Sequence, residues 1–289
     1  MLKNHISLTE MILFSPAKIN IGLQITERRK DGFHNLQSVM FPVGLCDILE
    51  IRISDEQEEG IRLDQSGIRL ESGSVKNLCI EAFELLSKET SLPSVHVHVH
   101  KQIPVGAGLG GGSSNAASAL RGLNSLSAEP VSEGKLHELA TQLGSDCPFF
   151  LYNQPMMMEG RGEILRPVPL QLDQVFLVLL FPRIHVSTAE AYGEVIPMVP
   201  GKHLKELIAE PLSKWKHLIT NDFEKSVFKK HPVLGTLKEA LYDAGSLYAS
   251  MSGSGSSLYG IFPEKPSLPE SIEQFVIWKG PLSGPQHGA

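Results

Sequence analysis

Five glycines lie between Gly106 and Gly112 of this chain, where a segment typical of a strand meets a segment typical of a helix. Before this run, valines at 95, 97 and 99 alternate with histidines, the period expected of a strand with one buried face. After it, residues 116–123 are rich in alanine and leucine, which favour a helix. Glycines let backbone N–H groups approach a ligand, and a helix N-terminus adds unpaired N–H groups. The strand–loop–helix order therefore predicts a binding site for a chain of phosphate groups.

The glycine run matches neither of two familiar nucleotide-binding loops. No lysine follows Gly112, as a Walker loop requires, and the glycine spacing and acidic residue of the dinucleotide fingerprint are absent. The hydroxyl groups of Ser113 and Ser114 can add donors or contact a magnesium ion. On glycine content alone, a loop with a purely structural role remains an alternative.

Two further segments hold candidates for the chemistry. Lys18 and Asn20 are two residues apart in a predicted strand, so both side chains lie on one face of it. Asp146 lies in the sequence Gly144-Ser-Asp-Cys-Pro148, where an aspartate is commonly a turn or capping residue. The spacing in these two segments does not by itself establish a function.

The histidines at 96, 98 and 100 lie on one face of the predicted strand at 95–99. Three histidines on one face could suggest a metal site. The alternation of the valines already explains their positions, and no carboxylate or cysteine is adjacent in sequence. We interpret them as a solvated strand face and assign them no metal.

The length of 289 residues favours two lobes, and the sequence predicts both strands and helices. Strands are expected at 11–14 and 18–25, separated by Ser15 and Pro16, and then, after a charged turn at 27–32, up to residue 43 and at 47–53. Helices are expected at 75–87 and 131–143, the second ended by Gly144. Beyond residue 160 we expect strands at 175–181, 247–251 and 257–262 and helices at 188–195 and 233–244. The boundary between the lobes is predicted within residues 159–167.

Charge and cysteine content exclude several classes of protein. The net charge is −6, so nucleic acid and other polyanions are not held by bulk charge, and phosphate groups must be met by local backbone geometry. Three cysteines are an odd number without paired spacing, which argues against a disulfide framework or a structural zinc site. The apolar run at 175–181 is far short of the roughly 20 residues of a membrane span, and residues 1–10 lack a signal-peptide pattern. We expect a cytoplasmic protein that binds neither nucleic acid nor a membrane.

Three segments in order along the chain resemble the motifs of the GHMP small-molecule kinases: 16–20 (Pro-Ala-Lys-Ile-Asn), 103–115 with the glycine run, and 251–256 (Met-Ser-Gly-Ser-Gly-Ser). Segments 29–36, 143–148, 159–163 and 221–222 are similar to the branch that phosphorylates the 2-hydroxyl group of a cytidyl diphosphate alcohol in non-mevalonate isoprenoid synthesis. The resemblance covers about residues 12–275. It implies an α+β fold of two lobes, with an N-terminal lobe like ribosomal protein S5 domain 2 over 1–162, a ferredoxin-like C-terminal lobe over 163–280, and a loose tail at 281–289.

The resemblance also implies roles for the residues of the chemistry. Asp146 matches the catalytic base, Lys18 the lysine beside that acid, and Asn20 a residue that orients the acceptor. ATP, with Mg2+ neutralising its phosphates, would lie on the glycine loop, although the sequence names no side chain as the metal ligand. The residues expected to bind ATP are Pro104, Val105, Gly106, Ala107, Gly108, Leu109, Gly110, Gly111, Gly112, Ser113 and Ser114.

Substrate choice rests on a separate set of residues in the resemblance. His34 matches a histidine that reads the cytosine ring, and Phe33 lies beside it where many members carry tyrosine, so a hydroxyl group is missing here. Tyr192 is the candidate for the second stacking ring.

The turn at 251–256 is expected to support the phosphate loop. Cys147 is interpreted as a small buried residue, and methionines 156–158 as core.

Two other hypotheses remain open from the sequence. The first is another GHMP kinase that acts on homoserine, mevalonate or a sugar, which the segment Asp31-Gly-Phe-His34 disfavours. The second is a catalytically silent nucleotide-binding regulator with the same fold. The presence of both Lys18 and Asp146 disfavours a regulator, because a protein that only binds nucleotides needs no lysine and carboxylate at the acceptor.

Overall fold

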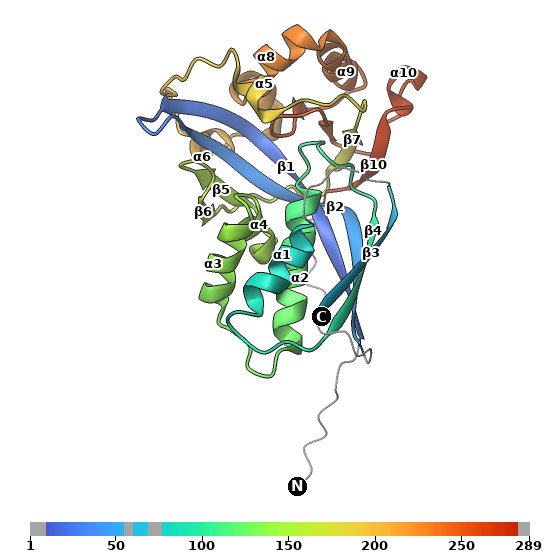
Figure 1. The fold of residues 1–289 in the computed structure, drawn as a ribbon. Coiled ribbons are helices and arrows are strands. Elements are labelled where there is room, and N and C mark those ends of the chain that lie inside the picture. Colours follow the sequence, from blue (N-terminus) through green and yellow to red (C-terminus); the bar gives the residue numbers. More distant parts are fainter. Residues whose placement is uncertain (1–9, 55–59, 69–76, 283–289) are drawn as a thin grey trace. The chain divides into compact units, whose positions relative to one another are not determined.

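The computed structural model describes residues 10–54, 60–68 and 77–282 (Figure 1). The chain divides into two compact packing units. The first unit comprises residues up to Pro16, Cys46–Ile103 and Gly111–Tyr152; the second comprises Ala17–Leu45, Pro104–Gly110 and residues from Asn153 onward. The predictions of a loose tail at 281–289, of no signal peptide at 1–10 and of a helix beginning at residue 75 fall largely or partly outside the described residues. The predicted lobe boundary at 162 stays a prediction.

The first unit contains part of a mixed sheet. Strand β4 (Val95–Lys101) is parallel to β3 (Ile61–Gly67) and antiparallel to the second half of β2 (His34–Ile53). The three valines of β4 are fully buried, which confirms the alternation predicted from the sequence. Strand β3 is not predicted from the sequence, because only the first and third residues of its sequence IRLDQSG are apolar.

Four helices pack together in the first unit: α1 (Leu78–Leu86), α2 (Gly111–Leu126), α3 (Glu133–Leu143) and α4 (Cys147–Tyr152). The predicted helix at 131–143 is confirmed, with Ser132 accepting from the N–H group of Lys135 at its start and Gly144 at its end. Helix α4 is not among the helices predicted from the sequence, and Pro148 lies in its first turn. Proline is tolerated in the first turn of a helix, so it does not end this one.

Strand β1 (Glu10–Arg28) corrects one prediction. The expected break at Ser15 and Pro16 is wrong, because the strand runs through both residues. Within the described sheet β1 pairs only with β2, so it is an edge strand, where a missing N–H group costs little. Strand β2 is also continuous and spans both stretches predicted up to residue 53.

The second unit contains two groups of strands. The first half of β2 pairs with β5 (Met156–Glu159), which pairs with β6 (Ile164–Pro167), and the methionines of β5 are buried as predicted. A separate antiparallel sheet has the order β10-β7-β9-β8. Its strands are β7 (Phe176–Leu180), β8 (Tyr248–Met251), β9 (Leu258–Phe262) and β10 (Val276–Pro281). The first three were predicted and are confirmed.

Helices of the second unit are mostly short, apart from α8 (Phe223–Lys230) and α9 (Pro232–Asp243). Helix α9 confirms the prediction at 233–244 and packs on β8 and β9. The others are α5 (Thr188–Tyr192), α6 (Leu204–Leu207), a 3-10 turn at Leu212–Lys214, α7 (Trp215–Leu218) and α10 (Glu270–Glu273). No helix in the described part of the chain has the length and apolar character needed to cross a membrane.

Candidate functional site

The glycine loop has a backbone conformation that requires glycine. Gly106, Gly108 and Gly110 have φ angles of +67°, +76° and +72°, in the left-handed region that other residues rarely adopt. A Cβ atom on Gly108 would lie 3.0 Å from the carbonyl oxygen of Gly255 and closer still to that of Ser252. The loop therefore passes against another backbone segment with no space for a side chain.

That segment is the turn at 252–257, which holds the loop through hydrogen bonds. The hydroxyl group of Ser252 donates to the carbonyl oxygen of Gly108 at 2.9 Å, and the N–H group of Ser257 donates to that of Ala107 at 3.2 Å. From β1, the N–H group of Lys18 donates to the carbonyl oxygen of Leu109 at 2.9 Å. The turn thus contacts the loop, as the resemblance implied.

Helix α2 begins earlier than predicted, at Gly111 rather than near residue 116. Gly111 through Ser114 are therefore residues of its first turn and not of a loop. The hydroxyl oxygen of Ser114 and the amide oxygen of Asn115 are buried and have no hydrogen-bond partner within the described residues. Buried polar atoms are normally satisfied, so a helix start with free N–H groups and an unpaired hydroxyl group fits an additional polar ligand such as a phosphate with its metal ion.

A buried ion pair that the sequence did not predict lies where β4 leads into the loop. Lys101 is 3% exposed and Asp47 is fully buried, and their charged groups are in contact. The other carboxylate oxygen of Asp47 accepts from the N–H groups of Gln102 and Ile103 at 2.7 and 2.8 Å. This ion pair therefore fixes the end of the strand immediately before Pro104.

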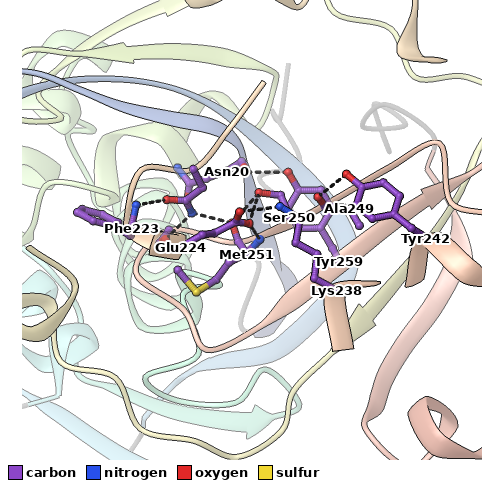
Figure 2. Close-up of polar contacts among 11 residues, drawn as sticks. Asn20, Phe223, Glu224, Lys238, Tyr242, Ala249, Ser250, Met251 and Tyr259 are labelled. Carbon is purple, nitrogen blue, oxygen red and sulfur yellow. Dashed lines mark hydrogen bonds and ion pairs between the residues drawn. The ribbon is translucent and has the colours of Figure 1, made fainter. Parts of the chain in front are cut away.

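Lys18 and Asn20 are brought together on β1, as their spacing predicted. Both are almost completely buried, and the Lys18 ammonium group donates to the amide oxygen of Asn20. The side-chain amide nitrogen of Asn20 donates to the hydroxyl group of Ser38 at 2.8 Å. The backbone carbonyl oxygen of Asn20 accepts from the hydroxyl group of Tyr259 at 2.8 Å (Figure 2). The Asn20 N–H group donates to Ser252 at 3.2 Å, so the turn at 252–257 contacts this pair as well.

Asp146 lies in the turn immediately before α4, half-buried, in the first packing unit. The N–H group of the following residue, Cys147, donates to the carbonyl oxygen of Gly144 at 3.2 Å and closes that turn. Burial, with a smaller contribution from the Asp146 charge, raises the pKa of the Cys147 thiol to about 11. Cys147 is therefore a neutral buried thiol, in agreement with its interpretation as a packing residue.

The residues expected to recognise the base lie in the second unit. The rings of His34 and Tyr192 are stacked, with centroids 4.9 Å apart and an interplanar angle of 24°. Phe33 is 56% exposed, and the guanidinium group of Arg161 lies 5.1 Å from its ring centroid. The structure thus brings His34 and Tyr192 together and adds Arg161, whose only signal in the sequence was the segment 159–163.

The three histidines of β4 have polar partners on neighbouring strands. His96 lies 2.8 Å from a carboxylate oxygen of Asp64, and His100 lies 2.9 Å from the hydroxyl group of Ser66. His98 lies 3.9 Å from Glu50. Among the residues that the structure describes, no group of three His, Cys, Asp or Glu side chains is arranged to hold a metal ion.

Comparison with known families identifies the class of protein. The family described as "GHMP kinases N terminal domain" matches residues 77–154, and "GHMP kinases C terminal" matches residues 204–276. Together with the two sheets and the glycine loop, these matches define the chain as a GHMP kinase, a phosphotransferase. The α+β GHMP kinase fold expected from the sequence is confirmed.

Individual relatives narrow the family. The 4-diphosphocytidyl-2-C-methyl-D-erythritol kinase of Bacteroides thetaiotaomicron is 47% identical over 261 residues, which cover 90% of this chain and 95% of the relative. A crystal structure of 4-(cytidine 5'-diphospho)-2C-methyl-D-erythritol kinase has a TM-score of 0.79 and 30% identity, and the match covers 95% of this chain and all of that one. The chain belongs to the 4-diphosphocytidyl-2-C-methyl-D-erythritol kinase family. Homoserine kinase from Cytophaga hutchinsonii shares the fold, with a TM-score of 0.66 and 18% identity over 95% of this chain and 90% of that one.

Proposed function

We propose that this protein transfers the γ-phosphoryl group of ATP to the 2-hydroxyl group of 4-diphosphocytidyl-2-C-methyl-D-erythritol. The observation that carries this proposal is the 47% identity, over 90% of the chain, to an enzyme named for that substrate. The glycine loop, the Lys18–Asn20 pair and the His34–Tyr192 stack supply groups suited to ATP, to the acceptor hydroxyl and to the base, respectively.

ATP phosphates bind along Pro104–Ser114 in this proposal. The left-handed glycines and the N-terminus of the 16-residue helix α2 offer N–H groups without bulky side chains, and the unpaired Ser114 hydroxyl group adds a ligand. Mg2+ that arrives with ATP neutralises phosphate charge, and the hydroxyl groups of Ser113 and Ser114, in the first turn of α2, are positioned to contact it. The net charge of −6 makes such local neutralisation necessary.

Asp146 acts as the proton acceptor of the phosphoryl transfer, and Lys18 stabilises the negative charge that develops. Asp146 accepts the proton of the 2-hydroxyl group, whose oxygen forms a bond to the γ-phosphorus as the bond from that phosphorus to the bridging oxygen of ADP breaks. The buried Lys18 ammonium group stabilises negative charge on the reacting oxygens, where low solvent access strengthens its effect. Asn20 holds the Lys18 ammonium group and orients the acceptor.

His34, Phe33 and Tyr192 select the cytidyl group. Aromatic rings bind a base through their faces, and a histidine ring nitrogen can form a hydrogen bond to the base edge. Phe33 retains the face of the more usual tyrosine but not its hydroxyl group.

A cytoplasmic location is part of the proposal, since ATP is available there and all three cysteines are free thiols.

A comparison of acceptor alcohols tests the proposal. The purified protein is assayed with ATP and, separately, with the cytidyl substrate, mevalonate, homoserine and galactose, with ADP release and phosphorylated product both measured. We expect turnover with the cytidyl substrate alone, and turnover at least about a hundredfold lower with the Asp146→Ala variant, which controls for contaminating kinases. Turnover with only the other alcohols would refute the substrate assignment. ATP binding without turnover of any alcohol would instead indicate a nucleotide-binding regulator.

A further inference from the structure

The tetrapeptide Asn221–Glu224, with sequence Asn-Asp-Phe-Glu, contacts three separate parts of the candidate site. We propose that it is a positioning element in which Asn221 sets the acceptor end of the site and Phe223 sets the base-recognition end, so that the two ends can be perturbed separately. This inference rests on the proposed function. None of the four residues has a role in the chemistry described above, and all four lie in the same packing unit as Lys18, His34 and Tyr192.

The tetrapeptide is tied to β1, the strand that carries Lys18 and Asn20. The N–H group of Asp222 donates to the carbonyl oxygen of Leu23 at 2.8 Å, and the Asp222 carboxylate accepts from the N–H group of Ile25 at 2.7 Å. Burial raises the pKa of this carboxyl group. The position of the tetrapeptide is therefore fixed relative to the strand of the acceptor site.

Asn221 uses both of its amide hydrogens on the turn that follows β8. Its side chain is 2% exposed and donates to the carbonyl oxygens of Met251 and Gly253, each at 2.8 Å. The side-chain oxygen of Asn221 accepts from the N–H group of Phe223 at 3.0 Å. These partners determine the orientation of the amide group, because only its nitrogen can donate. Loss of the two donors leaves two buried carbonyl oxygens without these bonds.

Gly253 lies directly against the Lys18–Asn20 pair. A Cβ atom on Gly253, whose φ is +57°, would lie 3.2 Å from the Asn20 amide oxygen and 3.5 Å from the Lys18 ammonium nitrogen. Its neighbour Ser252 bonds to both the N–H group of Asn20 and the carbonyl oxygen of Gly108. A shift of this turn therefore moves groups around the acceptor hydroxyl and the phosphate loop together.

Glu224 holds the start of the same turn. One carboxylate oxygen accepts from the N–H group of Met251 at 2.8 Å and from the hydroxyl group of Ser250 at 3.1 Å, and the other accepts from Lys238 at 2.6 Å (Figure 2). Lys238 balances the charge of a carboxylate that is mostly buried. Asn221 and Glu224 thus fix the backbone on both sides of Ser252.

Phe223 points to the other end of the site. Its ring packs edge-on against Tyr192, with centroids 4.7 Å apart and an interplanar angle of 71°, and Tyr192 in turn stacks on His34. The hydroxyl group of Ser226, one turn further along α8, donates to the carbonyl oxygen of Ala191 at 2.7 Å. Replacement of Phe223 should therefore disturb the ring that faces the base and leave the turn at 251–253 in place.

Steady-state kinetics of Asn221→Asp and Phe223→Leu test the separation. Because displacement of reacting groups by roughly 1 Å can lower a rate about a hundredfold, Asn221→Asp should lower kcat at least about thirtyfold while KM for the cytidyl substrate changes less than about threefold. Phe223→Leu should raise that KM about three- to tenfold, the range of an aromatic pair, with kcat within about twofold. Asn124→Asp is the matched control, because Asn124 also bonds a loop backbone, at Val131, at the far end of α2. It should leave both constants near the wild-type values.

The outcomes distinguish this inference from the proposed function. If the wild-type protein does not phosphorylate the cytidyl substrate, the proposed function fails; if it does and Asn221→Asp keeps wild-type kcat, the positioning role alone is refuted. If Asn221→Asp and Phe223→Leu change kcat alike and KM alike, the positioning role is also refuted, since a general loss of structure gives that result. If Asn221→Asp does not fold, Gly253→Ala perturbs the same contact from the other side and should show the same fall in kcat. Phe223→Met serves likewise for Phe223→Leu, and wild-type KM in a folded Phe223 variant refutes the second half.

Discussion

Replacement of Gly108 by alanine should displace the phosphate loop from the turn that holds it. Gly108 has a φ of +76°, and an added Cβ atom would approach the carbonyl oxygens of Ser252 and Gly255 to 3.0 Å or less. Both atoms belong to the backbone, so rotation of a side chain cannot relieve the overlap. Because carbon and carbonyl oxygen atoms pack at about 3.3 Å or more, the loop or the turn must move by roughly 1 Å.

Two contributions determine how much Gly108→Ala lowers the free energy of unfolding. A residue other than glycine in the left-handed region costs about 1–2 kcal/mol, and loss of the bond from Ser252 to the Gly108 carbonyl oxygen costs about 1 kcal/mol. The expected loss of about 2–3 kcal/mol corresponds to a fall in Tm of roughly 5–10 °C at 2–4 °C per kcal/mol. A misplacement of about 1 Å should also lower kcat/KM for ATP by up to about a hundredfold.

Thermal unfolding and ATP-dependent kinetics of Gly108→Ala measure both effects, with Gly134→Ala as control. Gly134 lies in α3, where an added Cβ atom meets nothing closer than the Ser132 hydroxyl oxygen at 3.9 Å. The control should raise stability by about 0.4–1 kcal/mol, because alanine restricts the unfolded chain without strain in the helix. A Gly108→Ala protein with wild-type Tm and wild-type KM for ATP would refute the reasoning that the loop and the turn are in obligatory backbone contact.

Three further predictions concern the site. Asp146→Ala should lower turnover at least about a hundredfold while ATP still binds by calorimetry, and near-normal turnover would exclude Asp146 as the base. His34→Ala should raise KM for the cytidyl substrate more than it lowers kcat; the reverse pattern would place His34 in the chemistry. Cys147, with a pKa of about 11, stays protonated at pH 8, so iodoacetamide should label it about a hundredfold more slowly than an ordinary thiol and faster as pH rises towards 11, as followed by peptide mass spectrometry. Rapid labelling of Cys147 at pH 8 would contradict its placement in the packed interior.

The sequence predicted those strands and helices in which apolar residues recur at the spacing of a strand or a helix. The alternating valines of β4 are fully buried, and α9 follows its helical pattern closely. The start of α2 at Gly111 could not be predicted in this way, because propensity alone disfavours a glycine-initiated helix. A Cβ atom at Gly111 would meet the Ile103 side chain at 2.8 Å, so close packing against a residue before the loop requires the glycine there.

The polar contacts of the site depend on residues far apart in the chain, and no local pattern reports them. The bonds from Asn221 to the 251–253 turn and from Ser252 to Gly108 exist only in the folded chain. Lys18 and Asn20 were recognisable as neighbours because a strand repeats every two residues. The functional roles of His34 and Tyr192 came from resemblance, and their stacking became visible only in the structure.

The buried ion pair between Asp47 and Lys101 limits how this region can change by mutation. Removal of one partner leaves an uncompensated buried charge, which typically costs about 3–5 kcal/mol, whereas exchange of both for apolar residues of similar volume can be almost neutral. Asp47 also accepts the two N–H groups that precede Pro104, so a double exchange would leave those donors unsatisfied. A protein that loses this ion pair by one substitution at a time therefore passes through a destabilised single variant. We expect Asp47 and Lys101 to be retained or replaced together in evolution.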